Sequence, residues 1–226
     1  MNRQYKLAIA ILALSSSAAH AGFITTGGLN GGNNGQLSTL GGACTVSFNA
    51  GSAANACGVT YSGVSSQNFQ TGTSPTHAAL AGDNSTYLAV GPSFGRSITI
   101  GLNQQANYFG FFTGSLDRYN LVQFYLDDTL VDAFTSADIN AVAFPGVATN
   151  GNQAASAYVN YFPTKGLTQT LFNRIVYSSS ADAFETDNHT FGQATPETLG
   201  VPEPGSLALL AIAGVTLLRS RAHRPV

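Results

Sequence analysis

Tryptophan is absent from this chain of 226 residues, methionine occurs once, and charged residues make up only 9% of the sequence. The missing tryptophan removes the ring that stacks most readily on the face of a sugar. Outside the two ends of the chain, no stretch repeats its apolar residues every 3.6 positions, so a helical bundle is not expected. The remaining composition is rich in Gly, Ser, Thr, Asn and Gln, which predicts a surface that is polar but mostly uncharged.

Basic residues are scarcest between Gly22 and Pro204. Four positive side chains there stand against all eleven acidic ones, a formal net charge of 4 − 11 = −7. Such a surface repels phosphate backbones, and the sequence has no basic stripe to attract them. Nucleic acid is therefore excluded as a partner.

Residues 1–21 have the pattern of a secretory signal peptide. Two basic residues precede the apolar run Leu7–Leu14, which is too short to span a bilayer and suits the core of a signal peptide. Ala19 and Ala21 fit the rule of small residues before a cleavage site. We therefore expect cleavage before Gly22 and transport by the export machinery.

Residues 201–226 consist of a short acidic motif, followed by an apolar run and then a basic end. The run Gly205–Leu218 would be roughly 21 Å long as a helix, against a hydrocarbon core of about 30 Å, so length alone fits a buried helix as well as a span. The acid at its start and the arginines at its end suit the helix dipole and the positive-inside rule. The residues that define the pattern are Pro202, Glu203, Pro204, Arg219 and Arg221.

This order of residues resembles the PEP-CTERM sorting signal of exported bacterial proteins. The resemblance implies recognition by an exosortase-type transpeptidase and transient anchoring in the inner membrane through the C-terminal helix. Delivery to the cell surface or the extracellular matrix would follow. A sorting signal of this kind determines where a protein is located and implies no activity.

Between the two ends we expect three parts: a loop-rich segment with room for one short strand at 22–42, a folded domain at 43–192 and a spacer at 193–200. Cys44 and Cys57 are the only cysteines, and an even number in an exported protein predicts a disulfide. A metal pair or a nucleophile is the alternative for these cysteines, but few histidines are present to support either.

The domain is predicted to be all-β. Residues 96–102 alternate polar and apolar side chains, which places Ile98, Ile100 and Leu102 on one face of a strand. Asp127-Asp128 separates two strand-like runs, as in a hairpin, and 136–140 suggests a helical turn. Strands are expected at 44–48, 58–62, 86–90, 96–102, 107–112, 121–126, 129–135, 156–162, 173–178 and 183–191. We expect an antiparallel β-sandwich, jelly-roll-like, flanked by the N-terminal signal helix and the C-terminal apolar helix.

The block from Ala106 to Asn120, followed by Phe124-Tyr125 and the run 183–188, is similar to a family of exosortase-dependent surface proteins with no established activity. The similarity covers about residues 87–192, and Phe112-Thr113 stands where the family tends to have Tyr-Trp. The resemblance implies a β-sandwich at the cell surface or in exopolysaccharide.

Two features are candidates for chemistry. Gly91-Pro92-Ser93-Phe94-Gly95 matches the nucleophile elbow of hydrolases, but that elbow needs a helix after the serine, and the alternating run at 96–102 favours a hairpin turn. Glu185 and Asp187 would share one face of a strand and are weak candidates for a structural calcium. Solvated turn and strand residues are the alternative for these and the other acids.

Taken together, the sequence predicts no catalytic residue and no cofactor beyond that calcium. We expect a structural or adhesive protein, not an enzyme, with matrix polysaccharide as the candidate ligand. A secreted hydrolase acting on exopolysaccharide is the alternative. Five tyrosines could offer a sugar platform, although packing in the core is the simpler role for most of them: Tyr108, Tyr119, Tyr125, Tyr158 and Tyr161.

Overall fold

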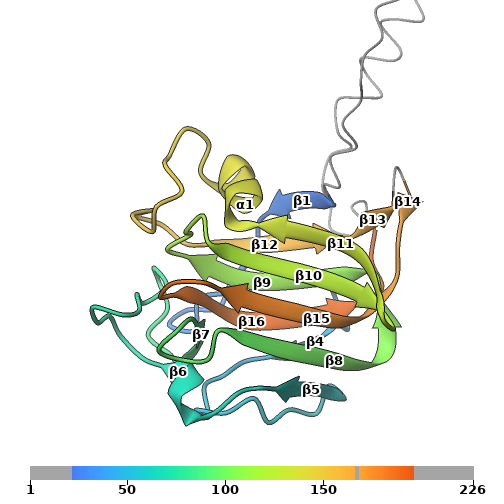
Figure 1. Cartoon of the computed structure of the whole chain (residues 1–226), viewed down its shortest axis with the longest axis horizontal. Coiled ribbons are helices and arrows are strands. Elements are labelled where there is room, and N and C mark those ends of the chain that lie inside the picture. The colour runs from blue at the N-terminus through green and yellow to red at the C-terminus, as the bar shows by residue number, and fades with distance from the viewer. Residues whose placement is uncertain (1–21, 166–167, 196–226) are drawn as a thin grey trace, which may run out of the picture.

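Two antiparallel sheets packed face to face form a sandwich in the computed structural model, which describes residues 22–165 and 168–195 (Figure 1). The larger sheet has the order β1 (Phe23–Thr26), β12 (Ala157–Phe162), β9 (Tyr108–Gly114), β16 (Phe184–Gly192), β7 (Tyr87–Val90) and β6 (Phe69–Gln70), and β4 (Cys44–Val46) also pairs with β16. The smaller sheet has the order β11 (Thr129–Thr135), β10 (Asn120–Leu126), β15 (Phe172–Ser179), β8 (Ser97–Ala106) and β5 (Val59–Ser62).

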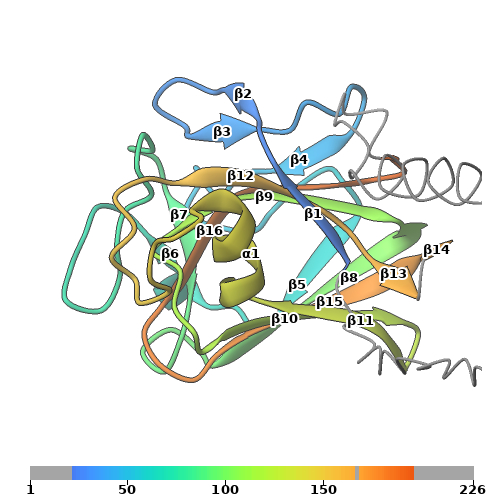
Figure 2. The same cartoon turned by 90° about the horizontal axis from the view of Figure 1, so that it is seen from above.

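Short elements complete the described chain. They are the pair β2 (Leu29–Asn30) and β3 (Gln36–Leu37), the pair β13 (Thr164–Lys165) and β14 (Thr168–Gln169), the 3-10 turn Ser66–Asn68 and the helix α1 (Ser136–Ala143). Figure 2 shows the sheets as two layers, with α1 beside the edge where β1 and β11 lie. In the described part of the chain, no helix combines the length and the hydropathy needed to cross a membrane.

Every strand predicted from the sequence is present within a few residues of its expected bounds, and the described chain is mostly β, with one short α-helix. The helical turn expected at 136–140 is the start of α1. The segment 22–42 contains three short strands where one was expected, and β1 joins the larger sheet by pairing with β12. The signal peptide, the sorting segment and the end of the spacer, at 1–21 and 196–226, lie outside the described residues.

An aromatic core fills the space between the sheets. Ile98 and Ile100 alternate inward from β8 as predicted, with exposed fractions of 1% and 0%. Phe109 and Phe111 point into the same core from β9, while Phe112 packs on the opposite face of its sheet. Loops cover that outer face, which explains why the aromatic run in β9 shows no polar alternation: both sides of the strand are buried.

The predicted disulfide is confirmed. Cys44 begins β4 in the larger sheet and Cys57 lies just before β5 in the smaller one, with 2.01 Å between the sulfur atoms. The bond therefore links the two sheets covalently.

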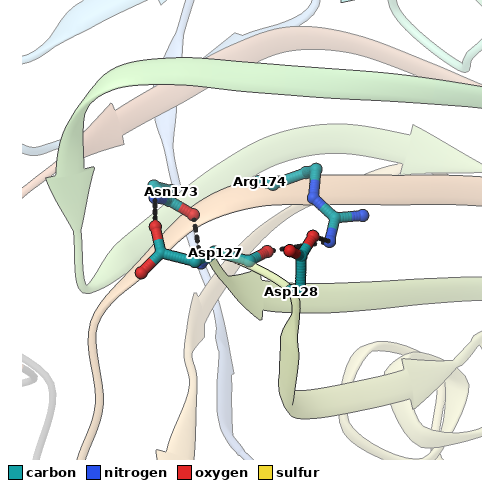
Figure 3. A network of polar contacts seen from close by, with 4 residues as sticks. All are labelled: Asp127, Asp128, Asn173 and Arg174. Atoms are coloured by element: carbon teal, nitrogen blue, oxygen red, sulfur yellow. Dashed lines mark hydrogen bonds and ion pairs between the residues drawn. The ribbon is translucent and has the colours of Figure 1, made fainter.

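The predicted hairpin at Asp127-Asp128 joins β10 to β11 (Figure 3). Asp127 has a φ of 54°, a conformation that Asp and Asn tolerate better than most residues. Asn173 exchanges two hydrogen bonds of 2.8 Å with Asp127, and Arg174 donates to the Asp127 carbonyl over 2.8 Å. Arg174 also lies 4.1 Å from the centre of the Tyr125 ring and 3.5 Å from the Asp128 carboxylate. These contacts fix the hairpin to β15.

Candidate functional site

A polar pocket of about 350 Å³ lies at one end of the sandwich. The loop between β6 and β7 and the loop between α1 and β12 form two of its walls and lie at the same end of the molecule (Figure 1). Its carboxyl groups come from Asp117, Asp182 and Glu185, and Tyr119 lies among them. A larger pocket of about 430 Å³ beside the disulfide has no ionisable side chain in its walls, so the acidic pocket is the better candidate for a site.

Glu185 forms the inner wall of the pocket, and its side chain is 1% exposed. The carboxyl oxygen Oε1 accepts a hydrogen bond of 2.8 Å from the backbone N–H of Ala78, whereas Oε2 is buried without a donor. Burial raises the pKa of Glu185 to about 8, and the negative charges of Asp117 and Asp182 add to this shift. At neutral pH the group is therefore mostly protonated and can donate a hydrogen bond.

Asp117 and Tyr119 occupy a turn that leads into β10. Burial raises the pKa of Asp117, and a hydrogen bond with Tyr119 partly offsets this. The Tyr119 hydroxyl donates to the Asp182 carbonyl over 2.8 Å, which ties the turn to the loop before β16. The pocket thus combines hydrogen-bond acceptors, a tyrosine and one protonated carboxyl within a small space.

Ser93 lies in a turn, as the sequence predicted, and not in a nucleophile elbow. Its neighbours Gly91 and Gly95 form an isolated antiparallel bridge, and the strand β8 follows where an elbow would need a helix. The prediction of a hairpin was wrong, because the turn connects β7 in the larger sheet to β8 in the smaller one and the two strands do not pair. The Ser93 side chain donates to Asp182, not to a histidine.

Glu185 and Asp187 share the outer face of the larger sheet, but they contact different loops. Asp187 accepts a hydrogen bond of 3.3 Å from the Phe48 N–H and one of 3.4 Å from the Ser85 hydroxyl. The same hydroxyl donates to Asp83 over 2.5 Å, so Ser85 joins two buried carboxyl groups. Burial raises the pKa of Asp187 to about 8, and Asp83 adds to the shift.

No three His, Cys, Asp or Glu side chains of the described residues gather in an arrangement that could hold a metal ion. The acids around α1 and the hairpin have backbone or surface roles. Asp138 accepts from the Thr135 N–H at the start of the helix over 2.7 Å, and Asp128 is exposed beside Arg174. The calcium expectation for Glu185 and Asp187 therefore stays a prediction.

The tyrosines do not form a platform for sugars. Tyr108, Tyr158 and Tyr161 are fully buried, and Tyr125 lies under Arg174. Of the five that the sequence suggested, Tyr119 alone lines the acidic pocket.

Sequence reasoning missed the pocket, because its walls come from segments far apart in the chain. His77, for example, lies in the wall and shares a hydrogen bond of 2.6 Å with Tyr87, yet nothing around His77 in the sequence marks it. The residues expected for signal cleavage (Ala19, Ala21) and for sorting (Pro202, Glu203, Pro204, Arg219, Arg221) lie outside the described residues. Gly22, the residue after the expected cleavage point, is the first one described and is buried.

Comparison with known proteins adds no relative. No protein-family model, no curated protein and no solved structure matches the chain.

Proposed function

We propose that this chain is an exported β-sandwich protein that an exosortase-type system sorts to the cell surface or the extracellular matrix. There it acts as a structural or adhesive protein that binds polysaccharide. The signal-peptide pattern at 1–21 and the sorting pattern at 201–226 support export. The Cys44–Cys57 disulfide suits an oxidising compartment outside the cytoplasm.

The observation that carries the binding proposal is the unpartnered oxygen of Glu185 in the wall of a polar pocket. A buried polar atom without a partner is costly unless a ligand or water satisfies it. Sugar hydroxyls both donate and accept, so they can pair with the protonated Glu185 and with the acceptors Asp117 and Asp182. Acidic residues outnumber basic ones in the domain, so a neutral glycan is a better ligand than an anionic one.

The hydrolase alternative also rests on this pocket. Glu185 has a raised pKa, and a carboxyl that remains protonated beside ionisable carboxyls is the arrangement of an acid–base pair in glycoside hydrolysis. The absence of an assembled nucleophile at Ser93 does not bear on that chemistry. A turnover assay distinguishes a binding protein from this enzyme.

We also propose that the sandwich is jelly-roll-like. The connections β7–β8, β8–β9, β9–β10, β11–β12 and β15–β16 each cross from one sheet to the other. Repeated crossing between two sheets supports a jelly-roll-like arrangement. The helices expected on either side of the domain would deliver it across the membrane and hold it there before sorting.

A glycan array with the purified protein tests binding, and each ligand found is then tested for hydrolysis. The variants Glu185→Leu and Asp117→Asn should weaken binding about tenfold or more, since the first removes a hydrogen-bonding group from the pocket and the second alters one. Asp128→Asn, which changes an exposed acid outside the pocket, serves as the matched control. Binding that is insensitive to both pocket variants would place the ligand elsewhere, and release of reducing sugar would favour the hydrolase.

Cell fractionation tests the location. Mass spectrometry of the exported protein should find Gly22 at its N-terminus and a single disulfide. Intact, unprocessed protein in the cytosol would contradict the proposed export.

A further inference from the structure

Gly22 packs closely against two side chains from other strands. A Cβ atom at this position would overlap the Tyr161 ring and would lie 2.8 Å from Oδ2 of Asp132. No residue larger than glycine fits here without a shift of the surrounding structure. The chain therefore brings the backbone of residue 22 directly to a carboxylate.

Asp132 is a buried acid without a cation in the described part of the chain. Its side chain is 3% exposed and accepts two backbone hydrogen bonds, from Ala133 over 2.8 Å and from Thr164 over 2.6 Å. The one ion pair among the described residues joins Arg174 to Asp128. Removing a carboxylate from water is expensive, and a positive partner offsets much of that cost.

The nitrogen of Gly22 is close enough to provide that partner. Because the nitrogen and a Cβ are bonded to the same Cα, the nitrogen lies within about 6 Å of Oδ2 of Asp132. The Tyr161 hydroxyl lies beside both groups. Burial is the main cause that raises its pKa, the charge of Asp132 raises it further, and the backbone N–H of Gly22 lowers it. This hydroxyl is also buried with no partner at normal hydrogen-bond geometry.

We propose that removal of the signal peptide turns Gly22 into an α-ammonium group that forms a buried ion pair with Asp132. In this step water adds across the bond between Ala21 and Gly22, which leaves a carboxylate on the released peptide and an ammonium on Gly22. The inference rests on the cleavage site in the proposed function. It explains why a glycine stands at this position, since a side chain would exclude the carboxylate.

The pair would join two sheet edges. Gly22 immediately precedes β1 at the edge of the larger sheet, and Asp132 belongs to β11 at the edge of the smaller sheet. Figure 2 shows these strands on the same side of the sandwich, with α1 next to them. Processing would thus complete the sandwich, and the exported form would be more stable than its precursor.

The test compares the exported, processed protein with the uncleaved precursor, each with Asp132 and with Asp132→Asn. In the processed protein the substitution should lower the melting temperature by roughly 5–10 °C, because it breaks a buried pair. In the precursor the loss should be smaller by at least half, since residue 22 carries no charge there. Asp128→Asn, at the exposed hairpin between β10 and β11, is the control and should affect both forms equally.

A second measurement does not depend on the stability of the variants. The α-amino group of Gly22, followed by NMR in the processed protein, should titrate at least one pH unit above the ordinary value of about 8. An ordinary pKa for this amine, or an equal loss from Asp132→Asn in both forms, would overturn the ion pair while leaving the cleavage intact. An N-terminus other than Gly22 would instead show that the proposed processing is wrong, and the ion pair would fall with it.

Discussion

The hydroxyl of Ser93 donates a hydrogen bond of 2.6 Å to the carboxylate of Asp182, and the backbone N–H of Ser93 donates a second one of 2.9 Å. The two bonds hold the turn between β7 and β8 against the loop before β16. Asp182 also contributes to the wall of the acidic pocket. Ser93 therefore positions a pocket residue, although its sequence context resembles that of a nucleophile.

The variant Ser93→Ala should fold and lose about 1 kcal/mol of unfolding free energy or less, because the bonded groups are exposed and the backbone bond to Asp182 remains. Urea denaturation measures this loss. If the chain proves to be a hydrolase, its turnover should survive the substitution. A loss of turnover of a thousandfold or more would mean that Ser93 is a nucleophile after all.

Strand positions were predictable wherever one feature of the sequence was sufficient. The alternation around Ile98 and Ile100 reports a half-buried strand, and Asp127-Asp128 has the composition of a two-residue turn. The disulfide followed from the number of cysteines alone. These are local signals, so no knowledge of the sheet order was needed to read them.

The pocket and the environment of β16 were not predictable, because they depend on which loops cover the larger sheet. Every residue of β16 from Phe184 to Phe191 is buried, including six polar ones in succession from Glu185 to Thr190. Asn188 has a φ of 52°, and the pairing with β9 shifts register between Asp187 and Thr190. An irregularity of this kind changes which side chains face the core, and a period-two pattern cannot anticipate it.

The disulfide should contribute to stability by restricting the unfolded chain. The cysteines are 13 positions apart, and closing a loop of that size is worth about 3 kcal/mol in the chain-entropy model. The double variant Cys44→Ser, Cys57→Ser should lose that amount in urea denaturation, and dithiothreitol should produce a similar loss in the wild type. No difference between the oxidised and reduced wild type would contradict the entropic account.

The contacts of Arg174 with Asp127 and Tyr125 should contribute more to stability than its ion pair with Asp128. Arg174 donates to the Asp127 carbonyl and covers the Tyr125 ring, so Arg174→Ala should cost about 1 kcal/mol. Asp128→Ala should have no measurable effect on stability, because the Asp128 side chain is fully exposed. Denaturation of both variants at low and high salt would test the difference. A larger loss for Asp128→Ala would show that the ion pair, not the carbonyl bond, holds the hairpin.

Acid should destabilise the protein through His189. This ring is buried in the core and contacts the Tyr61 hydroxyl at 3.0 Å and the Thr186 hydroxyl at 2.9 Å. Burial lowers the pKa of His189 from 6.5 to about 3, so between these values the unfolded chain takes up a proton that the folded chain does not. Stability is therefore lost as the pH falls through this window, at up to about 1.4 kcal/mol per pH unit.

The variant His189→Gln, compared with the wild type in urea at pH 7, 5.5 and 4, isolates this contribution. We expect the variant to be less stable at pH 7 and the difference to shrink as the pH falls. A constant difference across the three pH values would show that His189 titrates normally in the folded protein.

Asp187 should have the opposite pH dependence. Burial and the neighbouring Asp83 raise its pKa from 3.8 to about 8, so the folded chain holds a proton that the unfolded chain has released between these values. Stability is then fully present below pH 3.8 and is lost as the pH rises towards 8, by up to about 1.4 kcal/mol per unit. Asp187→Asn carries no charge and escapes this loss, so it should gain on the wild type with each pH unit between 4 and 8. Denaturation across that range measures the gain, and Asp128→Asn is the control.

If calcium instead binds between the carboxyl groups of Glu185 and Asp187, adding calcium in place of a chelator will raise the melting temperature of the wild type and leave that of Asp187→Asn unchanged.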